Sequence, residues 1–327
     1  MQILITGSAG RVGSSMVDEL QRRGHTVRGF DLNAGGSRES GYSEVVGSFD
    51  DADACRRAVE GVDVVVHLGA FMSWSPQDAD AMFRANVDGT RRLLEAAAAS
   101  GVRRFVFASS GEVYPENDPC VLPITEEHPL RPTSPYGLTK LLGEELVGFH
   151  QRRGTMETVI LRFSHTQNAS ELLDEDSFFS GPRFFLKPRI RQQERFGNMA
   201  VAKLLRGFDT GAAAHILARN EQGRPFRMHI TETRDMVAGL VLAVEDERAA
   251  GGVFNLGATD PVDFTPLVEK MSEITGYPVV TVDLPGAGVY YETSNRKIRE
   301  TLGYVPQWTI DRMLVEAGEA RKARLKG

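Results

Sequence analysis

The stretch TGSAGRVG (residues 6–13) follows an apolar run, QILIT, and opens a helical pattern that ends at Gly24. Its glycines are Gly7, Gly10 and Gly13. Glycines between a strand and a helix permit a tight turn and let the backbone approach a pyrophosphate at the helix N-terminus. A glycine-rich turn without a ligand is the alternative. The position directly between a strand and a helix favours a dinucleotide site, to which Val12 and Arg11 of the loop would also belong.

The rest of the first half repeats this strand-to-helix order. Near-continuous apolar runs, typical of strands in a parallel sheet covered on both faces, lie at 25–31, 43–47, 62–69, 103–109 and 156–164. Helical patterns lie between them at about 51–60, 78–100 and 134–152. This order predicts an α/β fold with a Rossmann-type doubly wound parallel sheet.

After residue 165 the alternation ends. Residues 168–197 carry many charges without a clear period and are predicted to form a long loop. The shorter elements that follow are helices near 197–208, 233–246, 264–275, 295–302 and 309–325, and strands near 213–218, 227–231 and 251–257. We expect residues 1–165, rejoined by about 233–257, to form the cofactor-binding domain. Residues 166–232 and 258–327 would form a smaller, discontinuous substrate-binding domain.

Composition narrows the functional classes. Among 327 residues, 41% are hydrophobic and 25% charged, as in ordinary globular proteins, and the net charge of −6 argues against nucleic-acid binding. No apolar run approaches the roughly 18–20 residues of a membrane span, and the first residues do not resemble a signal peptide. Cys55 and Cys120 lack metal or disulfide spacing. We therefore expect a cytoplasmic protein with reduced thiols and neither a metal site nor a membrane partner.

Asp31 ends the second predicted strand, where a carboxylate can accept hydrogen bonds from the adenosine ribose hydroxyls. The same charge would repel a 2′-phosphate, so NAD is expected rather than NADP. The alternative is a turn residue at the end of a strand. Arg11 weakens the preference for NAD over NADP, because its side chain could contact a phosphate.

Tyr136 and Lys140 lie four residues apart in SPYGLTK (134–140), on one face of a predicted helix. An ammonium beside a phenol stabilises the phenolate, so we expect the pKa of Tyr136 to lie below its usual value of about 10. Such a tyrosine could exchange a proton with a substrate hydroxyl while hydride moves to or from a nicotinamide. An ordinary amphipathic helix with a solvated lysine is the alternative.

On these motifs the chain resembles the extended short-chain dehydrogenase/reductases of the NAD-dependent sugar epimerase/dehydratase family, and UDP-glucose 4-epimerase-like enzymes in particular. The further matching segments are VDVVVHLGA (62–70), NVDGTRRLLEAA (86–97), FVFASSGEVYP (105–115), VILRF (159–163), FRMHIT (226–231) and SNRKIRETLGYVPQWTIDRML (294–314).

The resemblance implies catalytic roles for Ser110, Tyr136 and Lys140. It implies contacts to NAD from the glycine loop, Tyr136, Lys140, Asp31, Ser48, Phe49, Leu68, Gly69, Ala70 and Asn86. It also implies a sugar or nucleotide-sugar substrate that contacts Ser73 and Ser110, and a homodimer paired through the helices at 78–100 and 134–152.

The chain departs from the family at several of these positions. Ser48 and Phe49 stand where Asp-Leu is frequent, and His165 replaces an asparagine that faces the substrate. Residues 183–195 contain five cations and one acid, Glu194. This segment, with Arg189 in it, could hold a diphosphate or a sugar carboxylate; a solvated or subunit-contacting loop is the alternative. Asn198 and Arg227 occupy positions that touch a nucleotide diphosphate in the family.

Glu112 follows Ser110 by two residues and is expected to orient a sugar hydroxyl or abstract a proton; capping backbone amides is the alternative. Glycine at position 111 stands where dehydratases carry an acid, so dehydration is not expected. Three functions remain: a redox-neutral epimerase that works through a keto intermediate, a dehydrogenase of a free sugar or sugar acid, and a cofactor-sensing binding protein. The intact tyrosine and lysine argue against the last, and the epimerase is favoured.

Overall fold

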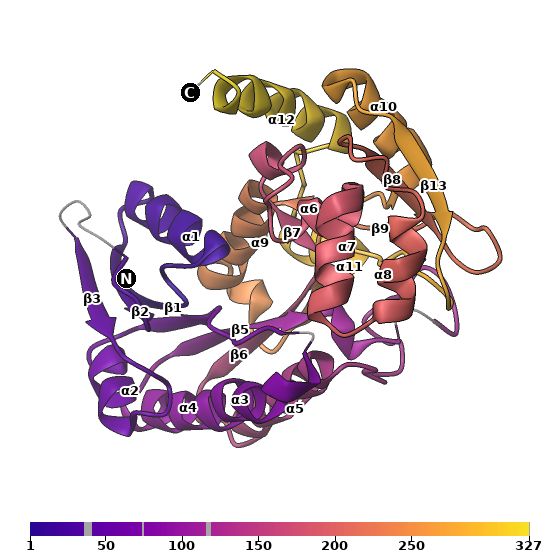
Figure 1. The fold of residues 1–327 in the computed structure, drawn as a ribbon. Helices are drawn as coiled ribbons and strands as arrows, with labels where there is room; N and C mark the ends of the chain where they lie inside the picture. Colours follow the sequence, from indigo (N-terminus) through magenta and orange to yellow (C-terminus); the bar gives the residue numbers. More distant parts are fainter. Residues whose placement is uncertain (36–40, 74, 116–118, 327) are drawn as a thin grey trace.

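A seven-stranded parallel sheet forms the centre of the computed structural model, which describes residues 1–35, 41–73, 75–115 and 119–326 (Figure 1). The strand order is β11-β6-β5-β4-β1-β2-β3. The strands are β1 (Gln2–Thr6), β2 (Thr26–Asp31), β3 (Tyr42–Val46), β4 (Val64–His67), β5 (Arg104–Ser110), β6 (Glu157–Phe163) and β11 (Val253–Leu256). This arrangement confirms the predicted Rossmann-type fold.

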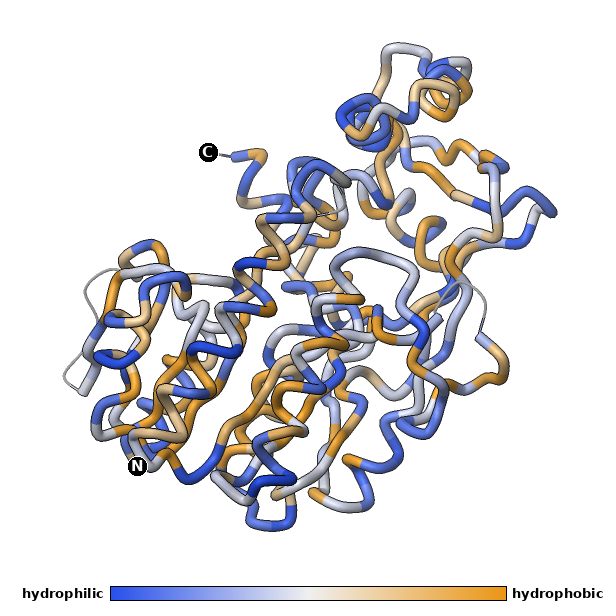
Figure 2. The backbone as a smooth tube through the Cα atoms, turned by 90° about the horizontal axis from the view of Figure 1, so that it is seen from below, coloured by the Kyte–Doolittle hydropathy of each residue, from blue (hydrophilic) through white to orange (hydrophobic). Residues whose placement is uncertain are grey.

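Helices cover both faces of the sheet (Figure 1). One face carries α1 (Arg11–Arg22), α9 (Thr233–Glu245) and α11 (Arg296–Leu302); the other carries α2 (Ala52–Val59), α4 (Gly89–Ala99) and α5 (Pro135–Arg152). Because side chains alternate along a strand, Ile3 and Ile5 pack toward α1 while Leu4 packs toward α2. Apolar residues accordingly gather along the strands and on the helix faces turned toward them (Figure 2).

The predicted helix at 78–100 is continuous but irregular. A 3-10 turn at Pro76–Asp78 leads into α3 (Ala79–Phe83), and a π-helical stretch at Arg84–Asp88 joins α3 to α4. Such wide turns are frequent at functional sites. The stretch contains the buried Asn86, one of the predicted cofactor contacts.

The remaining residues build a third hydrophobic core beside the sheet. Its strands pair as β8 (His215–Arg219) with β13 (Val279–Asp283), β9 (Arg227–Met228) with β12 (Val262–Asp263), and β7 (Thr166–Gln167) with β10 (Thr231–Glu232). Its helices are α6 (Ser180–Phe184), α7 (Leu186–Arg195), α8 (Met199–Arg206), α10 (Phe264–Thr275) and α12 (Ile310–Arg324). The division of the chain into two domains at the expected boundaries stays a prediction.

Two predictions for this region are wrong. Residues 168–197 are not one long loop, because α6 and α7 lie within them. Helix α7 buries Leu186, Ile190 and Gln193 at helical spacing, and the surrounding charges hide this period in the sequence. The single strand expected near 227–231 is two short strands, β9 and β10, and β13 was not predicted.

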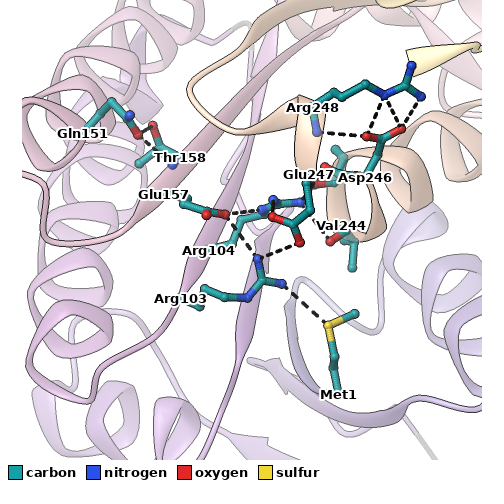
Figure 3. A network of polar contacts seen from close by, with 11 residues as sticks. Met1, Arg103, Arg104, Gln151, Glu157, Thr158, Val244, Asp246, Glu247 and Arg248 are labelled. Atoms are coloured by element: carbon teal, nitrogen blue, oxygen red, sulfur yellow. Dashed lines mark hydrogen bonds and ion pairs between the residues drawn. The ribbon is translucent and has the colours of Figure 1, made fainter. Parts of the chain in front are cut away.

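A buried arginine attaches α9 to the sheet (Figure 3). Arg104, at the start of β5, has no exposed side-chain surface. Its Nη1 donates to the carbonyls of Ala243, Val244 and Asp246 at the end of α9, at 2.9–3.2 Å. Its Nε donates to Glu157 Oε2 at 2.8 Å. A cation that satisfies the last carbonyls of a helix stabilises that end, so Arg104 joins β5 to α9.

Among the described ranges of the chain, no helix has the length and apolar character needed to span a bilayer.

We predict that Arg104→Met lowers the free energy of unfolding by about 2–4 kcal/mol, because it leaves helix carbonyls buried without a donor. Urea denaturation followed by circular dichroism measures the change. Arg103→Met is the matched control: Arg103 is 40% exposed and contacts the same carboxylates, Glu157 and Glu247, so its loss should cost less than about 0.5–1 kcal/mol. Equal losses in the two variants would contradict the anchoring role of Arg104.

Candidate active site

A cavity of about 500 Å³ lies where β1, β4, β5 and β6 end. In open α/β sheets, ligands bind outside the carboxyl ends of the strands. The predicted site residues that line it are Arg11, Val12, Leu68, Ser110, Glu112, Tyr136, Lys140, His165 and Arg189. Residues remote in the sequence, from the first loop to α7, therefore meet in one cavity.

Helix α5 carries the predicted proton-transfer residues. Ser134 caps its N-terminus by accepting the Gly137 N–H at 2.9 Å, and Pro135 occupies the first turn. The next turns place Tyr136 and Lys140 on one face. Lys140 Nζ donates to the carbonyl of Ala108 in β5 at 2.7 Å and lies 5.7 Å from the centre of the Tyr136 ring.

The pKa of Tyr136 contradicts the expectation from the sequence. Burial, and then the negative charge of Glu112, raise the pKa of the phenol above its usual range. Burial also lowers the pKa of Lys140 to about 8, against an opposing contribution from Glu144. The expected lowering of the tyrosine pKa was wrong because that reasoning considered the lysine charge and left out desolvation.

Glu112 links the end of β5 to the start of α5. Its Oε2 accepts the Ser134 hydroxyl at 2.5 Å, and its backbone N–H donates to Ser110 Oγ at 3.2 Å. Ser110 thus uses an acceptor position within this loop, and this bond leaves its hydroxyl hydrogen available to donate. The carboxylate lines the cavity, so the structure places Glu112 beside the predicted catalytic residues.

A buried ion pair that sequence reasoning missed holds α5 on the sheet. Glu144 and Arg162 are each 6% exposed, and Arg162 Nη2 donates to Glu144 Oε2 at 2.7 Å. Ser109 Oγ donates to the other carboxylate oxygen at 2.5 Å, and Arg162 Nη1 donates to Tyr114 at 2.7 Å. The sequence signal was present: Glu144 continues the four-residue spacing of Tyr136 and Lys140, and Arg162 interrupts an apolar strand.

The glycine loop fits a pyrophosphate. Gly7 has a φ of +68°, and a Cβ at Gly13 would lie 2.0 Å from the Gly7 carbonyl oxygen, so the first turn of α1 packs directly on the loop. Among the described residues, no side chain caps the α1 N-terminus, and the first turn of α1 carries no acid; this helix end is therefore suited to an anion. Asp31 Oδ2 accepts the Ala9 N–H at 3.1 Å, so the predicted ribose ligand also supports the loop.

Other predicted cofactor residues lie around β4. Asn86 is buried and exchanges hydrogen bonds with the backbone of Phe71 at 2.7 and 2.9 Å, and it donates to Thr139 of α5 at 3.0 Å. It therefore fixes the loop after β4 rather than reaching into the cavity. The Phe49 ring packs on Gly69, where a Cβ would lie 2.5 Å from the ring. In the same region, Ser48 Oγ accepts the Asp50 N–H and Ala70 is exposed.

Three predicted substrate contacts do not line the cavity. Ser73 donates to Asp78 Oδ2 at 2.6 Å. Asn198 is exposed, and its side-chain amide donates to Gln193 Oε1. Arg227 lies 3.4 Å from carboxylate oxygens of both Asp263 and Glu292.

The cationic segment divides between the cavity and the surface. Arg183 and Arg189 line the cavity, whereas Lys187 donates to the carbonyl of Gly211 and both Arg191 and Arg195 are exposed. The hypothesis that this segment holds a diphosphate or a sugar carboxylate therefore applies to two of its five cations, Arg183 and Arg189.

In the described parts of the chain, no group of His, Cys, Asp and Glu side chains could hold a metal ion.

Comparison with known proteins identifies the class. The model of the NAD dependent epimerase/dehydratase family matches residues 3–257, and the chain belongs to this family. This confirms the family resemblance and NAD as the cofactor.

A solved short-chain dehydrogenase/reductase superfamily protein from Agrobacterium tumefaciens, with bound NAD, is 67% identical; the match covers 99% of this chain and 98% of that chain with a TM-score of 0.96. UDP-glucose 4-epimerase of Corynebacterium glutamicum is 28% identical over 97% of this chain and 94% of that protein. Uronate dehydrogenase of Pseudomonas syringae pv. tomato is 35% identical over 49% of this chain and 58% of that protein.

We predict that Lys140→Met stabilises the protein at neutral pH. Because the folded-state pKa of about 8 lies below the unfolded value of 10.5, the buried ammonium destabilises the folded state most below pH 8. This penalty disappears as the pH rises toward 10.5. Relief of the penalty, less the lost bond to Ala108, should raise the free energy of unfolding by about 1–2 kcal/mol at pH 7.

Urea denaturation of NAD-free wild type and variant at pH 7 and pH 10 measures this gain. The gain should shrink at the higher pH. A difference between the two proteins that is the same at both pH values would contradict a lowered lysine pKa.

Proposed function

We propose that the protein is an NAD-dependent sugar epimerase that oxidises one hydroxyl-bearing carbon to a transient ketone and reduces it again from the opposite face. The observation that carries this proposal is the meeting of Ser110, Tyr136 and Lys140 in one cavity beside the glycine loop. The family membership and the full-length similarity to a UDP-glucose 4-epimerase support it.

The chain's own residues handle the proton. The glycine loop, Asp31 and Lys140 would hold NAD, which supplies a hydride acceptor when it is bound. Ser110 donates a hydrogen bond to the reacting oxygen, and Tyr136 exchanges the hydroxyl proton. Because the pKa of Tyr136 is raised, the phenol is protonated at neutral pH and can donate to a ketone oxygen. Donation of this proton leaves a phenolate that the Lys140 ammonium stabilises, and in the oxidative step the same phenolate takes the proton of the substrate hydroxyl.

Dehydration is not part of the proposal. Gly111 lies buried in a 3-10 turn between Ser110 and Glu112, and it has no side chain that could protonate a leaving hydroxyl. Glu112 can therefore orient a sugar hydroxyl or accept a proton, without an acid partner at its neighbouring position.

A net dehydrogenase of a free sugar or sugar acid is the second candidate. The observation in its favour is that Asn198 and Arg227, expected on a nucleotide diphosphate, do not line the cavity. The partial similarity to a uronate dehydrogenase points the same way.

We also propose that the protein is a cytoplasmic homodimer. Leu138 and Phe149 of α5 are 40% and 46% exposed. Exposed apolar residues on a helix that the family resemblance assigns to subunit pairing support the dimer.

We predict that Tyr136→Phe lowers turnover by roughly 10²–10⁴-fold, because it removes the proton relay and little else. NAD affinity and melting temperature should stay close to those of the wild type. Product NMR together with absorbance at the NADH band distinguishes the two candidates: an epimer without accumulated NADH supports the epimerase, and NADH formed in proportion to product supports the dehydrogenase. Wild-type turnover in the variant would exclude the proposed relay.

We predict that Glu112→Gln moves the pH profile of turnover to lower pH. Removal of the carboxylate charge lowers the pKa of Tyr136 toward its ordinary value, while Gln can still accept the Ser134 hydroxyl. Turnover measured across pH 5–10 tests this. A loss of about ten-fold or more at every pH would instead assign the carboxylate to the chemical step, and an unchanged profile would leave Glu112 with a structural role.

A further inference from the structure

Arg189 is a half-buried cation on the cavity wall. It lies on α7, and its Nη1 donates weakly to the carbonyl of Pro182 at 3.4 Å. Its Nε is buried and makes no hydrogen bond within the described structure. Burial lowers the pKa of this guanidinium, and no described acid counteracts that effect. A charged N–H group buried without a hydrogen-bond partner is costly, so an anion that enters the cavity would satisfy it.

The second cation of α6–α7 in the cavity is held by a histidine. Arg183 Nη1 donates to His165 Nε2 at 2.7 Å, and the His165 ring packs edge-on against Phe179 at 4.7 Å. Burial and the charge of Arg183 lower the pKa of His165 well below its usual value. The imidazole is therefore neutral, and its Nε2 accepts. His165 positions the Arg183 guanidinium and is not a third cation.

The other cations of the cavity have different partners. Arg11 forms an ion pair with Glu171 at 2.8 Å, and Lys140 donates to the Ala108 carbonyl. Among the described residues that line the cavity, Glu112 is the one carboxylate, and it accepts the Ser134 hydroxyl. The excess of positive charge thus lies on the wall built by α6 and α7.

We propose that Arg189 and Arg183 bind the carboxylate of a free sugar acid, and that sugar acids are the substrate class of this site. The inference rests on the proposed function, because it assigns the substrate of the same cavity. A planar guanidinium matches a carboxylate through two parallel hydrogen bonds. A nucleotide diphosphate is disfavoured because Arg227 is paired with Asp263 and Glu292 outside this wall.

The experiment measures binding rather than turnover. NAD-saturated protein is titrated calorimetrically with D-glucuronate, D-galacturonate, D-gluconate and D-galactonate, and with the amide of each acid. The amides keep the shape and remove the charge. We expect at least one acid to bind about 10- to 100-fold more tightly than its amide, the value of a charge-assisted hydrogen-bond pair.

Matched variants locate the effect. Arg189→Met should abolish the preference for acid over amide, and Arg189→Lys should restore part of it. Arg191→Met is the control, because Arg191 lies two residues further along α7 and is exposed; it should bind like the wild type. Retained melting temperature in Arg189→Met shows that the variant is folded.

Other results would overturn the inference. These are equal binding of acid and amide in all four pairs, no binding of any acid, equal losses in Arg189→Met and Arg191→Met, or tighter binding of galactose 6-phosphate or UDP. An acid that binds through Arg189 and is oxidised with NADH formed in proportion to product would leave the inference standing and contradict the proposed epimerase. Epimerisation of neutral or nucleotide sugars, without tighter binding of any acid than of its amide, would support the proposed function and contradict the inference.

Discussion

The buried Glu144–Arg162 ion pair is the interaction on which the geometry of the candidate active site depends. Removing two charges from water is expensive, and such a pair persists only where further hydrogen bonds satisfy its remaining atoms. Ser109 and Tyr114 supply these bonds from the end of β5 and the loop beyond it. The pair therefore joins α5 to β5 and β6 at one orientation of the helix. With α5 fixed, the four-residue spacing places Lys140 on the same inner face.

The same network reaches the edge of the sheet. Tyr114 donates to Asn255 Oδ1 of β11 at 2.8 Å, and the Asn255 backbone N–H donates to Glu126 at 2.8 Å. The Asn255 amide also donates to the carbonyl of Ser294, which precedes α11. A strand that enters the sheet from the C-terminal half of the chain is thus tied to the active-site helix by polar contacts. Satisfied buried networks of this kind specify a unique arrangement, which explains why β11 matters to the site although it carries no predicted site residue.

The sequence sufficed for features that depend on local pattern. The parallel sheet, the glycine loop and the Tyr136–Lys140 spacing each follow from a short run of residues. Features set by tertiary contacts were not predictable: α7 was hidden because its charges outnumber its buried positions, and the raised pKa of Tyr136 reflects burial that no motif reports. Arg227 is a further example, because its place in the motif FRMHIT is evident from the sequence, whereas its ion pairs with the distant acids Asp263 and Glu292 are not.

The partners of the arginines distinguish Arg189 from the other cations of the structure. Arg162 and Arg104 are buried and have carboxylates and carbonyls in close contact, and Arg11 and Arg227 lie beside acids. Burial lowers the pKa of the Arg162 guanidinium, but its hydrogen bonds and charge interactions with Glu144 and Tyr114 together outweigh this effect and the pKa is raised. For Arg189 burial acts without such compensation, and the pKa is lowered. Folding alone does not favour this arrangement, since an apolar side chain would pack there at lower cost. Functional sites are where proteins retain such unfavourable groups, and this is the physical ground for the proposed carboxylate site at Arg189.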